Sequence, residues 1–147
     1  MKIGIASDHR GYELKEKLKE ALIKENYEVI DYGTNSKEST DYPDYAFILG
    51  ENVANKNVDY GVAICGSGIG ISIACNKVKG VRCAKVTTKE EAEVTRIDND
   101  SNIVAFGEKT SFEEALEIVK TFINTKFSNL EKHNRRINKI KAYEESH

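Results

Sequence analysis

Short apolar runs alternate along this chain with segments of helical periodicity, and only short loops separate them. The apolar runs predict five strands, over Lys2–Ser7, Tyr27–Tyr32, Tyr60–Ile64, Val81–Val86 and Asn102–Phe106. Successive strands joined through a helix pair in parallel, because the helix carries the chain back to the same end of the sheet. The alternation therefore predicts an α/β fold, a Rossmann-like three-layer sandwich with a central parallel five-stranded sheet.

Capping residues mark where two of the intervening helices begin. Pro43, the only proline, suits the first turn of a helix, and that helix is expected to turn inward Ala46, Phe47, Gly50, Val53 and Ala54. Ser111 and Glu114 form an S-x-x-E pattern that caps an amphipathic segment. Helical spacing predicts further helices over about Ile69–Lys77, over about Lys89–Ile97 and through Leu14, Leu18, Ala21 and Leu22.

The length and charge of the chain exclude several classes of protein. With 147 residues, the chain is expected to form one domain over residues 1–147. A formal net charge of −2 gives no nucleic-acid footprint, and no apolar run is long enough to cross a bilayer. The first strand begins at once, with no room for a signal peptide, and three cysteines favour a reducing compartment. We expect a cytoplasmic protein that binds neither nucleic acid nor membrane.

The third predicted strand runs into Cys65 and a glycine-rich turn, Gly66-Ser67-Gly68-Ile69-Gly70. Such a turn lets successive backbone N–H groups converge on one point and create a site for negative charge. A thiol beside that site loses its proton more easily than a free cysteine. A base next to an anion hole is the equipment for removing a proton beside a carbonyl. The same pattern also fits a weak nucleotide-binding signal or a small buried cysteine.

Two regions outside this turn carry further candidate residues. Asp8 and His9 follow the first strand, and ligands of parallel sheets bind beyond the carboxyl ends of the strands, so this pair and the Cys65 turn are expected to share one crevice. The segment 128–147 is strongly basic, with a thin apolar seam. It is expected to form a helix that docks elsewhere, on a second subunit, although a solvated terminal helix has the same pattern.

Five blocks of the sequence carry a resemblance to a known family: Asp8-His9, Cys65–Gly70, Asn76-Lys77-Val78, Asn99-Asp100-Ser101-Asn102 and His133–Arg136. In these blocks the chain resembles the ribose-5-phosphate isomerase B family, which also holds subunits of galactose-6-phosphate isomerase. The similarity runs from end to end. It implies a Rossmann-like fold, a homodimer that in some members pairs into a tetramer, no metal and no redox cofactor. It also implies interconversion of an aldose phosphate and a ketose phosphate through a cis-enediolate.

The resemblance assigns roles residue by residue. Some members place the base on a glutamate just after the glycine turn, but here that position is Ile71, so Cys65 is expected to be the base. The other catalytic assignments are Ser67 and Asp98. The implied contacts to the sugar and its phosphate are Asp8, His9, Tyr42, Gly66, Gly68, Ile69, Gly70, Asn99, Lys109, Lys132, His133 and Arg136. Arg136 can grip a phosphate through two parallel hydrogen bonds, whereas Lys109 and Lys132 stand where the family has arginines and offer only point charges.

The main departure from the family is Asp98, which stands where a histidine is credited with opening the furanose ring. A carboxylate is a poor general acid near neutral pH. Either the pKa of Asp98 is raised, another residue opens the ring, or the substrate has no ring to open. The resemblance makes ribose 5-phosphate the expected substrate. The departure at Asp98 keeps another sugar phosphate as the alternative: allose 6-phosphate, galactose 6-phosphate or a tetrose 4-phosphate.

Two other classes of function compete with an isomerase. A nucleotide-binding module would need an acidic ribose-binding residue about twenty residues after the turn, where the chain has Lys85-Val86-Thr87-Thr88. A silent partner subunit would have no need for Cys65 and an intact glycine turn. Cys75 and Cys83 are expected to be small core residues. The sequence therefore favours a sugar-phosphate isomerase.

Overall fold

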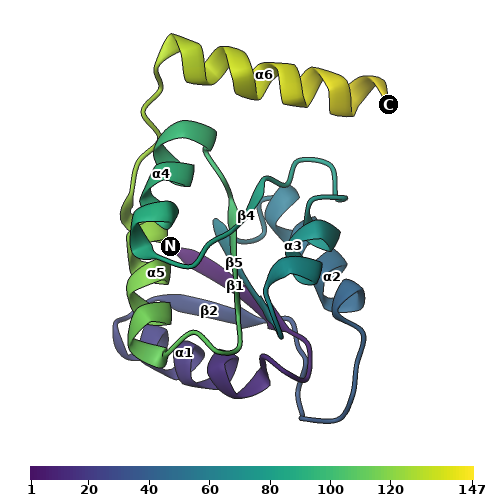
Figure 1. Cartoon of the computed structure of the whole chain (residues 1–147), viewed down its shortest axis with the longest axis vertical. Helices are drawn as coiled ribbons and strands as arrows, with labels where there is room; N and C mark the ends of the chain where they lie inside the picture. The colour runs from purple at the N-terminus through teal and green to yellow at the C-terminus, as the bar shows by residue number, and fades with distance from the viewer.

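The computed structural model describes all residues from 1 to 147 and contains one sheet of five parallel strands (Figure 1). The strands are β1 (Lys2–Ser7), β2 (Glu28–Asp31), β3 (Tyr60–Cys65), β4 (Cys83–Lys85) and β5 (Ile103–Gly107). Their order in the sheet is β2-β1-β3-β5-β4, and every neighbouring pair is parallel. This confirms the predicted fold class. The second and fourth strands are shorter than the sequence predicted.

Helices cover both faces of the sheet and give the three layers. They are α1 (Tyr12–Lys24), α2 (Tyr42–Ala54), α3 (Ile69–Cys75), α4 (Lys89–Asn99), α5 (Phe112–Asn124) and α6 (Glu131–Ser146). One hydrophobic cluster joins the sheet to α1, α4 and α5, and a second joins the opposite face to α2 and α3. Ser111 accepts a hydrogen bond from the Glu114 amide at 3.2 Å, which confirms the predicted N-cap. None of the helices has the length and apolar character that crossing a membrane would require.

Side chains of β3 alternate between the two faces of the sheet and join the hydrophobic clusters on either side. Val62 and Ile64 enter the cluster with α1 and α5, whereas Ala63 and Cys65 enter the cluster with α2 and α3. The prediction that Phe47 faces inward is wrong, because its side chain is 41% exposed. Helix α2 instead buries Ala46, Leu49, Gly50 and Val53, a stripe of smaller side chains that fits against the small residues on this face.

At the centre of the sheet, the chain leaves two neighbouring strands, β1 and β3, in opposite directions. β1 leads to β2 on one side, while β3 leads through α3 to β4 on the other side. The loops after β1 and β3 therefore leave in opposite directions and open a crevice between them, which is where ligands bind in open parallel sheets. Asp8 follows β1 and Cys65 ends β3, so both lie at this crevice.

The predicted terminal helix is α6, which lies at one end of the molecule, apart from the sheet (Figure 1). Only His133 and Ile137 of this helix are buried, and it packs on α4. Glu144 near its end accepts a hydrogen bond from the Gly80 amide at 3.0 Å. Most of the surface of α6 therefore faces solvent in a single copy of the chain.

Candidate active site

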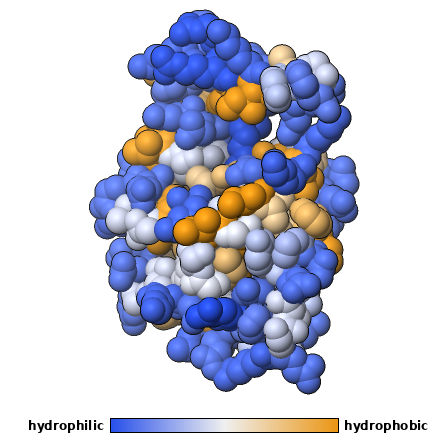
Figure 2. Space-filling model, turned by 45° about the vertical axis from the view of Figure 1, so that its right-hand side comes forward, coloured by the Kyte–Doolittle hydropathy of each residue, from blue (hydrophilic) through white to orange (hydrophobic).

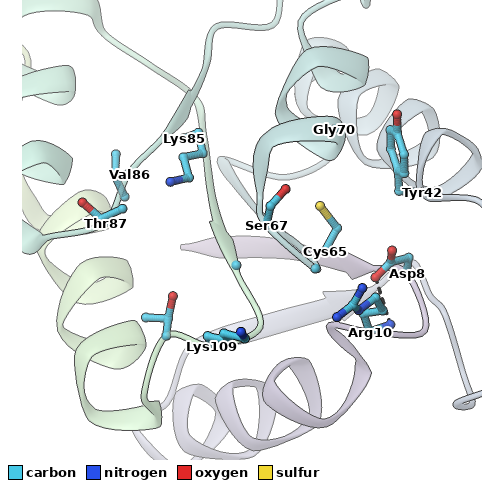
Figure 3. A pocket seen from close by; sticks show the side chains of 13 residues that line it. Asp8, Arg10, Tyr42, Cys65, Ser67, Gly70, Lys85, Val86, Thr87 and Lys109 are labelled. Carbon is cyan, nitrogen blue, oxygen red and sulfur yellow. Dashed lines mark hydrogen bonds between the residues drawn. The ribbon is translucent and has the colours of Figure 1, made fainter.

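A cavity of about 670 Å³ opens at the carboxyl ends of the strands (Figure 3). Four loops, one after each of β1, β3, β4 and β5, contribute to its walls, and α2 adds an aromatic ring. The lining residues are Asp8, Arg10, Tyr42, Cys65, Gly66, Ser67, Gly70, Lys85, Val86, Thr87, Gly107, Lys109 and Thr110. Seven of the residues assigned from the sequence are among them: Asp8, Tyr42, Cys65, Gly66, Ser67, Gly70 and Lys109.

The thiol of Cys65 lies at the inner end of this cavity (Figure 3). The residue is 4% exposed, and its Sγ accepts a hydrogen bond from the Gly68 amide at 3.2 Å. Gly68 has φ +80°, and a Cβ there would lie 2.6 Å from the backbone carbon of Phe106. Only glycine fits this position, since both the backbone conformation and the space exclude a side chain. The turn therefore folds back over the sulfur.

Several amides of the turn have no acceptor within the chain. The N–H of Gly68 points at Cys65, and that of Ile69 donates to Ser67 Oγ at 3.1 Å. No backbone or side-chain acceptor is found for the N–H groups of Gly66, Ser67, Gly70 and Ile71. Unpaired amides beside a cavity can stabilise an oxyanion that forms there.

Asp8 is held against the Cys65 strand by the tight loop after β1. Its amide donates to the carbonyl of Ile64 at 3.3 Å, and its Oδ1 accepts from the amides of Arg10 and Gly11 at 3.0 and 3.1 Å. A Cβ on Gly11 would lie 2.8 Å from the Ile64 oxygen, so this close approach requires glycine. Asp8 Oδ2 has no partner in the chain and is available to a ligand in the cavity.

His9 does not line the cavity of its own chain. Its Nδ1 accepts a hydrogen bond from the Thr40 amide at 3.1 Å, and its own amide donates to Thr40 Oγ1 at 3.2 Å. The neutral ring therefore carries its proton on Nε2. This pairing ties the loop after β1 to the long loop before α2, and it leaves Nε2 without a partner in the chain.

Tyr42 forms the wall above the second half of the turn. A Cβ on Gly70 would lie 2.7 Å from the Tyr42 ring, so the ring rests directly on this glycine. Gly70 therefore serves the packing as well as the turn. Lys109 lies on the opposite side of the cavity, after β5, with no carboxylate within 4 Å (Figure 3).

The remaining assigned residues lie away from the cavity within one chain. Asp98 Oδ1 is 3.5 Å from His133 Nε2, while His133 Nδ1 is 2.6 Å from Ser128 Oγ. Asn99 Oδ1 accepts from Thr95 Oγ1 at 3.1 Å and lies in a neighbouring hollow that shares Lys85 with the cavity. The others are Ile69, whose side chain is exposed, and Lys132 and Arg136, which are exposed on α6. The chain thus brings together half of its candidate site.

Sequence reasoning missed six lining residues: Arg10, Lys85, Val86, Thr87, Gly107 and Thr110. All six lie at or just after the carboxyl ends of strands, and this position was the available signal. Arg10 and Lys85 matter most because, with Lys109, they place three cations in the lining of the cavity. No three His, Cys, Asp or Glu side chains come together in a way that would hold a metal ion.

Comparison with known proteins gives a consistent result over the whole chain. The Ribose/Galactose Isomerase family model matches residues 3–140. Ribose-5-phosphate isomerase B of Escherichia coli is 39% identical, over 98% of this chain and 97% of that protein. The structure of ribose-5-phosphate isomerase B from Clostridium thermocellum has a TM-score of 0.96 at 46% identity, covering 99% of both chains. The enzyme of that name from Mycoplasma genitalium, solved with bound ribulose-5-phosphate, has a TM-score of 0.93 at 37% identity, covering 99% of this chain and 97% of that one.

Proposed function

The chain belongs to the ribose/galactose isomerase family and is a sugar-phosphate isomerase; on this premise we propose that it interconverts ribose 5-phosphate and ribulose 5-phosphate through a cis-enediolate. The observation that carries the proposal is the position of Cys65. Its sulfur lines a cavity beside amides that have no other acceptor. A thiol packed only among hydrocarbon side chains would have no access to a substrate.

Cys65 is the base in this mechanism. Its thiolate takes the proton from C2 of the open-chain aldose, and the electrons of that bond form the C1–C2 double bond while O1 becomes negative. A proton moves from O2 to O1, and the Cys65 thiol then gives its proton to C1 as the C2 carbonyl forms. The free amides of Gly66, Ser67 and Gly70 stabilise the negative oxygen, a contribution of a few kcal/mol for each well-placed donor.

Asp8 and Ser67 orient the sugar. The unpaired Asp8 Oδ2 accepts from sugar hydroxyls, which discriminates between stereoisomers. Ser67 Oγ steadies the turn through the Ile69 amide and keeps its hydroxyl proton for the substrate. Lys109 contributes one charge to the phosphate from the loop after β5.

A second copy of the chain completes the site in this proposal. Lys132, His133 and Arg136 lie on a helix that covers little of its own chain, so the residues 128–147 of one copy are taken to reach the cavity of the other. Exposed hydrophobic side chains support an interface between copies: Phe47, Ile48, Ile69, Ile73, Val94, Leu130, Ile140 and Tyr143. Figure 2 shows hydrophobic residues on the face below the charged terminal helix. The three free cysteines favour a cytoplasmic setting.

Asp98 supports a second candidate substrate for the same aldose–ketose isomerisation. Because no histidine stands at this position, a sugar phosphate that needs no ring opening is the alternative substrate. A tetrose 4-phosphate meets this condition, since its terminal oxygen is blocked and it cannot close a furanose ring. Allose 6-phosphate and galactose 6-phosphate form rings and still need an acid.

The test is a steady-state comparison of four substrates in ordinary water and in D₂O: ribose 5-phosphate, erythrose 4-phosphate, allose 6-phosphate and galactose 6-phosphate. We expect the highest kcat/KM with ribose 5-phosphate, and solvent deuterium at C1 of the ketose product. A much higher kcat/KM with another sugar would reject ribose 5-phosphate as the substrate. Isomerisation by the Cys65→Ala variant at the wild-type rate would reject the base.

A further inference from the structure

Arg10 is the cation nearest the reacting end of the cavity, and the mechanism above does not use it. Its side chain lies across the first glycine of the turn: a Cβ on Gly66 would be 3.2 Å from both Cδ and Nε of Arg10. Figure 3 shows Arg10 beside Asp8 and on the same side of the cavity as Cys65. The guanidinium therefore adjoins the peptide that follows the proposed base.

An ion pair fixes Arg10 in this position. Nε donates to Glu108 Oε2 at 2.7 Å, and the Glu108 amide in turn donates to the carbonyls of Cys65 and Gly66 at 2.9 and 3.2 Å. Glu108 is thus tied to the same peptide on which Arg10 lies. The hydrogen bond to Glu108 raises the pKa of Arg10, so the guanidinium stays charged at every working pH.

The ion pair uses only one edge of the guanidinium. No acceptor within the chain is found for Nη1 or Nη2, and the side chain is 58% exposed on the cavity side of the loop. Lys85 and Lys109 also line the cavity, but Lys85 ends β4 and Lys109 follows β5, both on the other side of the turn from Arg10 (Figure 3). Arg10 alone combines a fixed side chain with free donors next to Gly66.

We infer that Arg10 is a further catalytic residue, whose free Nη–H groups donate to an oxygen of the enediolate while Glu108 holds the guanidinium in place. This inference rests on the proposed function, because it needs the reaction to pass through an enediolate beside Cys65. Arg10 transfers no proton. Its role is to stabilise the negative charge that alternates between O1 and O2 while Cys65 carries the proton between C2 and C1. Glu108 is a positioning residue.

The test compares Arg10→Ala with Lys79→Ala, which removes the same charge from an exposed position outside the cavity. Arg10→Ala is expected to lower kcat by roughly 10- to 100-fold with little change in KM, a smaller loss than for a fully buried oxyanion donor because the Arg10 side chain is 58% exposed. Lys79→Ala should leave kcat within about twofold, because solvent screens an exposed charge that makes no direct contact. Arg10→Met keeps the contact with Gly66 and should lose kcat as Arg10→Ala does.

Inhibitor binding separates stabilisation of the enediolate from a merely structural role. A phosphorylated four-carbon hydroxamic acid has a planar O–N–C–O group that resembles the enediolate, whereas ribitol 5-phosphate lacks it. Arg10→Ala should weaken hydroxamate binding by the same factor as kcat and leave the Kd of ribitol 5-phosphate unchanged. Equal losses for both ligands, or an unchanged kcat, would overturn the role of Arg10. If the wild-type protein isomerises no sugar phosphate, the proposed function fails first and this inference falls with it.

Discussion

A buried lysine of the β-sheet body and two exposed cations of the terminal helix have opposite surroundings. Lys15 of α1 is fully buried, with its Nζ 2.6 Å from Asp31 and 2.8 Å from Glu16. Lys132 and Arg136 of α6 are exposed and have no carboxylate within 4 Å. A buried cation with two carboxylates is committed to the fold, whereas an exposed cation without one is available to a ligand or a partner. This difference separates a residue that holds the body together from residues that we propose act at the site of a second copy.

The largest expected effect concerns the catalytic base, which we propose lies in the β-sheet body at Cys65, and Cys65→Ala tests this assignment. The variant should lose at least about 10³-fold in kcat, because removal of a general base forfeits most of its catalytic contribution. Cys75→Ala is the matched control: it removes another buried thiol from the same hydrophobic cluster, away from the cavity. Rates of ribose 5-phosphate isomerisation and thermal unfolding would be measured for both. A loss of rate in Cys75→Ala at unchanged Tm would mean that the wrong thiol is assigned.

The Lys15–Asp31 pair should affect stability and not chemistry. Burial alone would raise the pKa of Asp31, but hydrogen bonds from Lys15, the Gly33 amide and Lys19 outweigh it and lower the pKa. Asp31→Asn leaves Lys15 buried without its closest carboxylate, at a cost of about 3 kcal/mol in the free energy of unfolding. Since the folded-state pKa lies below the unfolded one, this stabilisation is complete above about pH 4 and is lost as the pH falls further.

Urea unfolding of the wild-type and Asp31→Asn proteins, at pH values from 3 to 7 in steps of about one pH unit, measures that dependence. The difference between the two should be largest at neutral pH and shrink at the acid end. The activity of the folded fraction should match that of the wild type. A difference that stays constant with pH would show that the carboxylate charge contributes nothing to stability.

Arg136→Ala tests the terminal helix. It should raise KM for the sugar phosphate by about tenfold, since a bidentate phosphate contact is lost, with kcat and Tm nearly unchanged. Lys139→Ala removes a charge from the same helix and serves as the control. An effect confined to kcat would give Arg136 a part in the chemistry instead.

Mixing variants shows which copy supplies Arg136. Consider a dimer of one Cys65→Ala chain and one Arg136→Ala chain. If each site takes Arg136 from the partner, one of the two sites is intact, because the Arg136→Ala chain supplies Cys65 and the Cys65→Ala chain supplies Arg136. Activity at low substrate concentration should therefore rise on mixing. If each cavity used its own Arg136, neither site would be intact and mixing would leave the activity of the Arg136→Ala chain as it was.

The sequence predicted the five-stranded sheet, its parallel pairing and the candidate residues at the carboxyl ends of β1 and β3, because those features follow from local patterns such as the Val62–Cys65 run and the glycine turn. It failed at Phe47, where the small residues on the opposing sheet face decide which side of α2 is buried. It missed Arg10 in a loop and Lys85 at the end of β4, since a single cation at such a position has no periodic signature and becomes recognisable only when several strand ends and their loops come together. Asp98 and His133, assigned separate roles, lie 3.5 Å apart because α6 packs on α4. Their contact depends on where a distant helix docks, which no local pattern encodes.

Asp98 lies between the two regions, at the end of the helix on which α6 packs, and its replacement should have the smallest effect. If the substrate is a cyclic pentose phosphate, Asp98→His should raise kcat/KM for ribose 5-phosphate by about threefold or more, because an imidazole is a better acid near neutral pH than a carboxyl group. Turnover of erythrose 4-phosphate, which has no furanose ring, should not change. Asp98→Asn is the control, since it removes the charge beside His133 without adding an acid. Equal gains for both substrates, or a gain in Asp98→Asn, would assign the effect to His133 and the docking of α6, because ring opening is confined to the cyclic sugar and needs a proton donor.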